Sequence, residues 1–248
     1  MPTPGNDAAI EVMFLQQQGS DPFTEVPERI AQANAVATRI AGFIEQAQST
    51  LDIAIYDFRL HGDPALIISE ALRNRAKQGV VIRIAFDAAT NPEPHLTPAE
   101  APALLEADKK PPGTETFVRA FADVASLKAI TGYRVLMHNK YIVRDAQAPD
   151  AGVFTGSANY TNDSWGLQEN NLLFLVSQSL AAHYARDFSD LWLRGRIRDN
   201  PGSDDVSSVG IGGVDVAVAS RPAKVRLSSK RSSALFLARE LCSTLRQL

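Results

Sequence analysis

One stretch of the chain places a nucleophile and a cation two residues apart. His138 and Lys140 begin the run HNKYIVRD, which ends at Asp145 and is apolar and rich in β-branched residues. Such a run is typical of a β-strand, and alternate residues of a strand project from the same face. The sequence therefore predicts that the side chains of His138 and Lys140 share one surface.

This pair suits the transfer of a phosphoryl group. A neutral imidazole can attack phosphorus without prior deprotonation, and it leaves readily as a phosphoramidate. Lys140 could neutralise a nonbridging phosphoryl oxygen, and Ser157 and Asn159 of the later run GSAN could donate hydrogen bonds to the same oxygens. Phosphoryl transfer needs chiefly such electrostatic stabilisation. We therefore predict chemistry that requires no divalent ion.

Two carboxylates near this stretch are predicted to have different roles. Along an uninterrupted strand, Asp145 faces away from His138 and Lys140. We expect it to order the following turn or to support the site from behind, without touching the phosphate. Glu169, just before an apolar strand, is the best candidate for a carboxylate that orients the imidazole and stabilises its charged form.

The residues before this stretch predict an α/β unit. Apolar residues recur at helical spacing from about Glu28 to Gln48, and residues 51–58 are apolar enough for a central strand. A helix then runs from near Pro64 to Gln78, Gly79 stops it, and a buried strand follows at 80–86. Strand, helix and strand in this order indicate a mixed, largely parallel β-sheet with helices on both faces.

The other elements are predicted from the same patterns. Residues 88–116 contain six prolines and His95, and we expect an irregular insertion with a short helix at about 98–107. The patterns further predict an edge strand at 10–15, a helix at 117–130, a strand at 133–137, adjacent strands at 141–143 and 153–155, a strand at 172–176 and a helix at 180–193.

The composition excludes several classes of protein. The single cysteine, Cys242, rules out an intramolecular disulfide, and the four histidines lack metal-binding spacing, so we expect no metal or other cofactor. No apolar run is long enough for a membrane helix, and residues 1–7 do not resemble a signal peptide. We therefore expect a cytoplasmic protein without a transmembrane segment.

Charge and composition divide the chain. Residues 221–248 carry seven basic groups and one acid, which leaves a net charge of −9 on residues 1–220. We predict one domain over 1–196, a linker rich in Gly, Ser and Asp over 197–213, and a basic segment over 214–248. That last segment loosely repeats the strand and helix order of the N-terminus, so it is a candidate start of a second repeat.

The spacing H-x-K-x4-D, followed by GSAN and by Glu169-Asn170 before a strand, resembles the phospholipase D superfamily, the HKD phosphodiesterases. The resemblance covers roughly residues 10–195 and implies a phospholipase D-like fold. It further implies His138 as nucleophile or general acid, Lys140 and Asn159 as phosphate ligands, Ser157 as an auxiliary donor and Glu169 as the group that orients the histidine. The chain departs from the compact bacterial nucleases of the family in a longer segment between Asp145 and the GSAN run.

In this family two such motifs meet at an interface, and one histidine attacks while the other protonates the leaving oxygen. Because this chain has one motif, the resemblance implies either a homodimer with a two-fold axis through the site or the first half of a two-motif enzyme. We expect a metal-independent phosphodiesterase that works through a phosphohistidine. Its expected substrate is DNA or RNA; the alternatives are a phospholipase D or phosphatidyl transferase acting on phospholipid, and an inactive domain that binds nucleic acid or protein.

Overall fold

A seven-stranded sheet forms the centre of the part of the chain that the computed structural model describes, which is residues 10–21, 24, 26–88, 113–132, 136–197, 206–211, 214–219 and 235–238. Its strands lie in the order β1-β9-β7-β6-β2-β4-β5. Their bounds are β1 Ile10–Leu15, β2 Thr50–Ile55, β4 Val81–Asp87, β5 Ser126–Ile130, β6 Lys140–Arg144, β7 Gly152–Gly156 and β9 Asn170–Val176.

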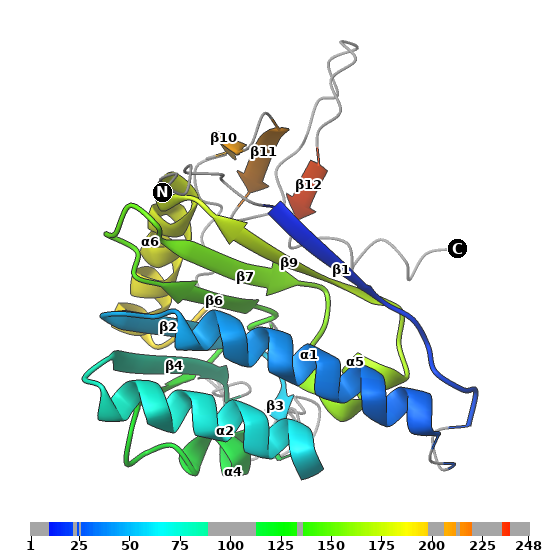
Figure 1. The fold of residues 1–248 in the computed structure, drawn as a ribbon. Coiled ribbons are helices and arrows are strands. Elements are labelled where there is room, and N and C mark those ends of the chain that lie inside the picture. The colour runs from blue at the N-terminus through cyan, green and yellow to red at the C-terminus, as the bar shows by residue number, and fades with distance from the viewer. Residues whose placement is uncertain are drawn as a thin grey trace, which may run out of the picture.

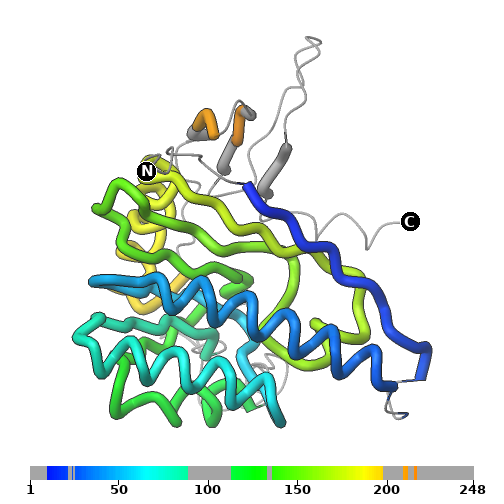
Figure 2. Tube along the Cα trace, viewed as in Figure 1, coloured from blue at the N-terminus to red at the C-terminus, as the bar shows by residue number. Residues whose placement is uncertain are grey.

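The sheet is mixed. β2, β4 and β5 are parallel neighbours, whereas every pair from β2 through β6, β7 and β9 to β1 is antiparallel. β6 and β9 therefore run against the other five strands. The predicted mixed α/β sheet is confirmed, although only two of its six neighbouring strand pairs, β2 with β4 and β4 with β5, are parallel. Figure 2 shows β1, from the start of the described chain, beside the much later strand β9.

Helices cover both faces of this sheet (Figure 1). α1 (Pro27–Glu45) and α2 (Gly62–Lys77) pack on one face, where Ile40 and Phe43 join a core with Ile53, Ile142 and Phe154. α6 (Gln178–Arg194) packs on the other face, in a second core. α2 has the predicted start and end, because Pro64 lies in its first turn and Gly79, with φ of 87°, follows its last residues.

One predicted helix is wrong. Residues 117–130 divide into the end of the short helix α4 (Thr114–Arg119), a turn and the strand β5. β5 pairs parallel with β4, so sheet pairing overrides the helical spacing of its residues. Residues 136–139, where the predicted strand 133–137 ends, are irregular. His95 and the helix predicted at 98–107 lie outside the described residues.

A small sheet follows α6. β10 (Val206–Ile211) and β11 (Val214–Ala219) form an antiparallel hairpin, and β12 (Leu235–Ala238) is parallel to β11. Ile211 and Val216 are buried in the same core as Leu180 and Phe188 of α6. A strand thus occupies part of the predicted linker 197–213, and the hairpin packs against the main sheet's α6 side.

The two tryptophans are packing residues, on opposite faces of the main sheet. Trp165, in the short helix α5 (Asn162–Gly166), is fully buried in the core beneath α1 and α2. Trp192 of α6 packs against the other core, with its ring stacked on Phe188 at 5.5 Å between centroids. In the described residues, no helix has the length and apolar character needed to cross a membrane.

Candidate active site

Four strands of the main sheet bring their ends together at the place where the predicted site residues other than Asp145 lie. β6 and β9 run against β2 and β7, so Ile55 pairs with Lys140 and Gly156 pairs with Leu172. The last residues of β2 and β7 therefore lie beside the first residues of β6 and β9. We call this the site end of the sheet; the opposite end of β6, at Arg144, is the far end.

His138 and Lys140 lie together at the site end. His138 precedes the first residue of β6, and Lys140, only 7% exposed, is that first residue. Lys140 Nζ donates to the carbonyl oxygen of His138 at 3.3 Å. Alternate residues of a strand share a face, and Ile142 is buried in the core beneath α1 and α2. Lys140, two residues before it, therefore belongs to the same face of the sheet.

Tyr56 joins these two residues and was not predicted to be part of the site. It directly follows β2, and its ring centroid lies 4.8 Å from that of His138 and 5.4 Å from Lys140 Nζ. Burial raises the pKa of Tyr56, and the charges of Asp87 and Asp57 raise it further. The phenol is therefore protonated at neutral pH, and an uncharged ring contacts both the imidazole and the ammonium group. Its position near the carboxyl end of the central strand predicted at 51–58 was a signal that could have identified it.

Ser157 follows β7 at the same end, and its hydroxyl is already used within the fold. Ser157 Oγ donates to Asn170 Oδ1 at 2.8 Å and accepts a hydrogen bond from the backbone N–H of Asn171 at 3.0 Å. Ser157 therefore ties the loop after β7 to the start of β9. The structure brings it to the site end, but its proton points at Asn170.

Asn159 is half-buried and held through its backbone. Its N–H donates to Ser164 Oγ at 3.0 Å. Its buried side-chain Oδ1 has no hydrogen-bond partner among the described residues. This oxygen is an acceptor and would not bind an anionic phosphate, so the predicted phosphate contact of Asn159 would have to come from its amide N–H group and stays a prediction.

Gly156 explains why the GSAN run begins with glycine. A Cβ at this position would overlap the carbonyl oxygen of Asn171 and would lie 3.0 Å from Leu172 Cα, both of them backbone atoms of β9. Only a residue without a side chain allows the two strands to approach this closely. This approach sets the position of Ser157 and Asn159 relative to β6.

Glu169 lies at the site end, immediately before β9, and is exposed. Within the described residues no hydrogen bond joins it to His138. The structure therefore brings Glu169 to the correct end of the sheet without showing the predicted contact, and its role stays a prediction.

Asp145 lies at the far end, one residue beyond β6. Its carboxylate accepts hydrogen bonds from the N–H groups of Gln48, Ser49 and Thr50 and from the Ser49 hydroxyl, at 2.7 to 2.9 Å. Burial alone would raise its pKa, but these donors together lower the pKa below its usual value. Asp145 thus orders the loop before β2, about 17 Å along the strand from Lys140 at 3.3 Å per residue.

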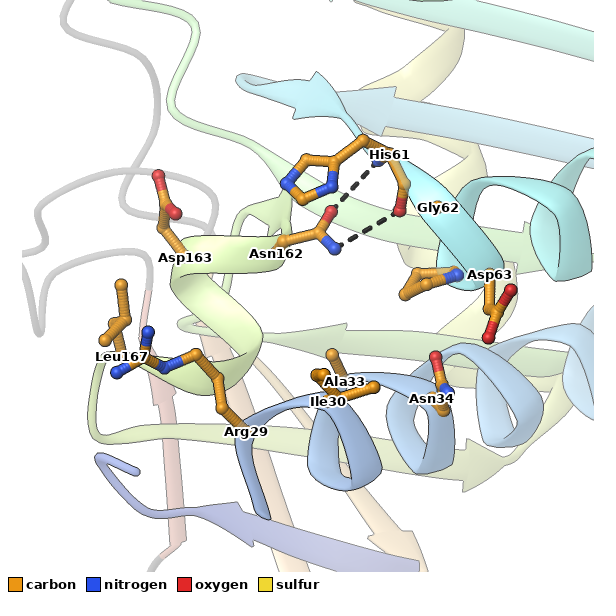
Figure 3. Close-up of a pocket in the computed structure, with 11 residues that line it drawn as sticks. Arg29, Ile30, Ala33, Asn34, His61, Gly62, Asp63, Asn162, Asp163 and Leu167 are labelled. Atoms are coloured by element: carbon orange, nitrogen blue, oxygen red, sulfur yellow. Dashed lines mark hydrogen bonds between the residues drawn. The ribbon is translucent and has the colours of Figure 1, made fainter. Parts of the chain in front are cut away.

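A cleft of about 610 Å³ lies elsewhere, between the first turns of α1 and α2 and helix α5. Figure 3 shows His61 and Asn162 on one side of it and Asn34 and Asp63 on another. Asn162 Oδ1 accepts a hydrogen bond from the His61 N–H at 3.0 Å. None of the predicted catalytic residues lines this cleft. The described residues also contain no cluster of three or more His, Cys, Asp or Glu side chains that could hold a metal ion.

Comparisons with known proteins give the family to which the chain belongs. The family described as "Cardiolipin synthase, PLD-like domain" matches residues 40–192, which include β2, β6, β7 and β9. No curated protein sequence matches the chain. Among solved structures, the phospholipase D family member Nuc from Salmonella typhimurium is 18% identical, with a TM-score of 0.47, over 77% of this chain and 99% of its own.

Two further structures are similar at the same level. NucT from Helicobacter pylori is 16% identical, with a TM-score of 0.43, over 75% of this chain and 98% of its own. Phosphatidylserine synthase from Haemophilus influenzae is 15% identical, with a TM-score of 0.44, over 73% of this chain and 38% of its own. The family match covers more than half of the chain, and it shows that the protein belongs to the phospholipase D superfamily and is an enzyme of the phosphodiesterase class.

Proposed function

We propose that the protein is a metal-independent phosphodiesterase in which His138 forms a phosphohistidine. The observation that supports this most is the arrangement of His138, Lys140 and Tyr56 at the site end of the sheet, where the buried Lys140 ammonium contacts the histidine residue and both contact one aromatic ring. A buried cation beside a nucleophile favours the binding of an anionic phosphodiester next to both of them.

The reaction has two steps. A ring nitrogen of His138 donates its lone pair to phosphorus, the bond from phosphorus to the leaving oxygen breaks, and an acid protonates that oxygen. Water then attacks the phosphohistidine, and the imidazole leaves as the phosphate monoester forms. Lys140 and the Asn159 amide stabilise the charge on the nonbridging oxygens, and Glu169 orients the imidazole. Ser157 contributes by holding its loop against β9, rather than by donating to phosphate.

The acid that protonates the leaving oxygen is a second histidine in this proposal. The chain has one H-x-K motif, so the simplest source is His138 of a second copy, related by a two-fold axis through the site. A second motif in the same polypeptide, beyond the basic segment, is the alternative. Sedimentation of the active protein tests this, because an active monomer would contradict the two-fold arrangement.

We propose nucleic acid as the substrate. Acyl chains need a continuous apolar surface near the reacting group. Among the described residues, the exposed large apolar side chains are spread over several elements, and only Leu136 adjoins the site in sequence; they are Val12, Phe14, Ile30, Leu66, Val81, Leu136 and Leu193. This distribution favours a polar substrate.

A phospholipid substrate is the second candidate, because the matching family is described as a cardiolipin synthase domain. In that case the phosphohistidine would transfer a phosphatidyl group to an alcohol instead of to water. Incubation with single-stranded DNA, duplex DNA, RNA and phosphatidylcholine vesicles distinguishes the two. Cleavage of vesicle lipid without cleavage of any nucleic acid would contradict our choice.

The activity itself is tested with bis(p-nitrophenyl) phosphate in excess EDTA. We expect hydrolysis by the wild type and none by His138→Ala or Lys140→Ala, with both variants folded. Activity that appears only after divalent metal is added would contradict the mechanism. A trapped radiolabelled phosphoprotein should lose its label in acid, because phosphohistidine is labile there; a label stable in acid would exclude it.

A further inference from the structure

A carboxylate on α6 reaches the site segment from behind the sheet. Asp187 Oδ2 accepts a hydrogen bond from Asn139 Nδ2 at 3.2 Å and another from the Tyr141 hydroxyl at 2.7 Å. Asn139 is only 4% exposed and stands between His138 and Lys140 in the chain. One carboxylate oxygen of α6 therefore binds the residue that is covalently adjacent to both predicted reacting residues.

The segment that Asp187 contacts lies outside the regular strand ladder. β6 begins at Lys140, so His138 and Asn139 precede the paired residues of the sheet. Their backbone is held by the Tyr56 N–H, which donates to the Asn139 carbonyl oxygen at 2.8 Å, and by a bond from the His138 N–H to Leu136 O at 2.9 Å. Backbone pairing with β2 therefore reaches this segment through a single hydrogen bond, and the side-chain contact between Asn139 and Asp187 holds it further.

The sheet separates Asp187 from the substrate side. Tyr141 and Val143 are buried in the core shared with α6, whereas Ile142, on the same parity as Lys140, is buried in the core beneath α1 and α2. Asn139 and Tyr141 therefore point toward α6, and Lys140 points away from it. Holding Asn139 toward α6 aims the flanking side chains at the other face.

We propose that Asp187 is a positioning residue that holds His138 and Lys140 in their reactive orientation by binding Asn139 from the opposite face of the sheet. The proposal rests on the proposed function, because it takes His138 and Lys140 as the reacting pair. A displacement of about 1 Å at a reacting group can reduce a rate about 100-fold. Loss of Asp187 therefore lowers kcat and leaves KM little changed, since Asp187 touches no substrate.

The test compares two acidic residues of the same helix. Asp187→Ala should lower kcat on bis(p-nitrophenyl) phosphate about 10- to 100-fold. Asp187→Asn, which keeps a side-chain oxygen as acceptor, should retain kcat within about threefold of the wild type. Asp190→Ala is the matched control, because Asp190 is exposed on the same helix and its carboxylate lies 3.6 Å from Arg194, one helical turn away. It should leave kcat and KM unchanged.

A kcat for Asp187→Ala within twofold of that for Asp190→Ala would overturn the proposal. A rise in KM with unchanged kcat would overturn it as well. If Asp187→Ala does not fold, Asn139→Ala provides the same test, since it removes the link and leaves the Tyr141 bond to Asp187. It should reproduce the loss of kcat, and in the double variant with Asp187→Asn the loss should not exceed that of Asn139→Ala alone.

Nuclear magnetic resonance separates this proposal from the proposed function. The His138 imidazole signal, assigned from its absence in His138→Ala, should shift in Asp187→Ala and stay in place in Asp190→Ala. This result is expected whether or not the wild type hydrolyses any phosphodiester. An unshifted His138 signal in folded Asp187→Ala would overturn the positioning role, even if the protein proved to be an active phosphodiesterase.

Discussion

The two ends of β6 each carry a buried cation, but the surroundings of these cations differ. At the site end, Lys140 contacts His138 and the Tyr56 ring. At the far end, Arg144 donates to the carbonyl oxygen of Gln46 at 3.3 Å and lies over the Phe43 ring. Lys140 thus faces the groups predicted to react, whereas Arg144 faces the end of α1.

The histidine and the aspartate of the motif also differ in their surroundings. His138 lies at the site end of the sheet, and Asp145 at the far end accepts hydrogen bonds from four donors of residues 48–50. The spacing H-x-K-x4-D therefore spans one strand, with chemistry assigned to its first residues and folding to its last. A sequence motif of this kind can combine two requirements that act independently, and the following predictions test that independence.

The largest effect is expected from His138→Ala. Removal of the nucleophile should lower kcat/KM by at least about 10⁴-fold, while the midpoint of thermal unfolding stays close to that of the wild type. Kinetics and calorimetry on the same preparation measure both. His61→Ala, which removes an exposed histidine next to α2, is the control. A large fall in the unfolding midpoint of His138→Ala would mean that the site end also supports the fold.

Asp145→Ala should have the opposite profile. It leaves three backbone N–H groups without their acceptor and should lower the free energy of unfolding by about 3 kcal/mol, with the rate per folded molecule preserved. Urea titration followed by assays at low temperature measures this. Asp150→Ala, at an exposed position near Arg144, is the control. Lost activity in fully folded Asp145→Ala would show that the two ends are coupled.

The stability that Asp145 contributes should depend on pH. Because its pKa is lowered in the folded state, its contribution is present above the ordinary carboxyl pKa and disappears as pH falls through the lower, folded pKa. The difference in unfolding free energy between the wild type and Asp145→Asn should therefore be constant above about pH 5 and shrink in more acidic solution. A difference that grows on acidification would contradict the hydrogen-bonding account.

A moderate effect is expected from Tyr56→Ala. Loss of the ring removes the contact with both His138 and Lys140, and kcat should fall about tenfold, equivalent to about 1.4 kcal/mol. Tyr56→Phe keeps the ring and should stay within about twofold of the wild type, because the phenol is not expected to exchange a proton. If Tyr56→Phe were as slow as Tyr56→Ala, the hydroxyl itself would take part in the reaction.

The smallest effect is expected from Ser157→Ala. Its hydroxyl bonds Asn170 and Asn171, so its removal should cost about 1 kcal/mol of stability and reduce kcat by no more than about threefold. Thr155→Val, which removes a neutral hydrogen bond from Thr155 Oγ1 to Lys140 O, is a control with similar loss of stability. A 100-fold loss of kcat in Ser157→Ala alone would restore the direct contact with phosphate that the resemblance implies.

The sequence predicted most of the fold because its local signals agree with the final sheet. The strand at β2, the helix with Pro64 in its first turn and the strand at β4 form the predicted unit with parallel strands. The pattern at 126–130 failed, because this edge strand has exposed and buried positions at a spacing that also fits a helix. Only the pairing with β4 makes this segment a strand, and the pairing partner cannot be read from the sequence of the segment itself.

The site was predictable in part for the same reason. Alternation along a strand predicted that Asp145 faces away from His138 and Lys140, but the structure separates Asp145 from them by distance, because it lies one residue beyond β6 at the far end. Tyr56 and Asp187 were missed, because they reach the motif from elements 82 and 48 residues away from His138 and Asn139, respectively, and only tertiary packing brings them together. The hydrogen bond from the Ser157 hydroxyl to Asn170 likewise could not be predicted, because it depends on how β7 and β9 pair.

The chain contains two tryptophans, and the sheet separates them into different cores. Trp165 is buried beneath α1 near the loop that carries Asn159, whereas Trp192 lies on α6, one helical turn beyond Asp187 and Phe188. Each single-tryptophan variant therefore gives a fluorescence signal from one face of the sheet. Trp165→Phe would leave an emission that reports on the docking of α6, and Trp192→Phe one that reports on the site loop. The protein thus contains a pair of optical probes with which unfolding of the two faces can be followed separately.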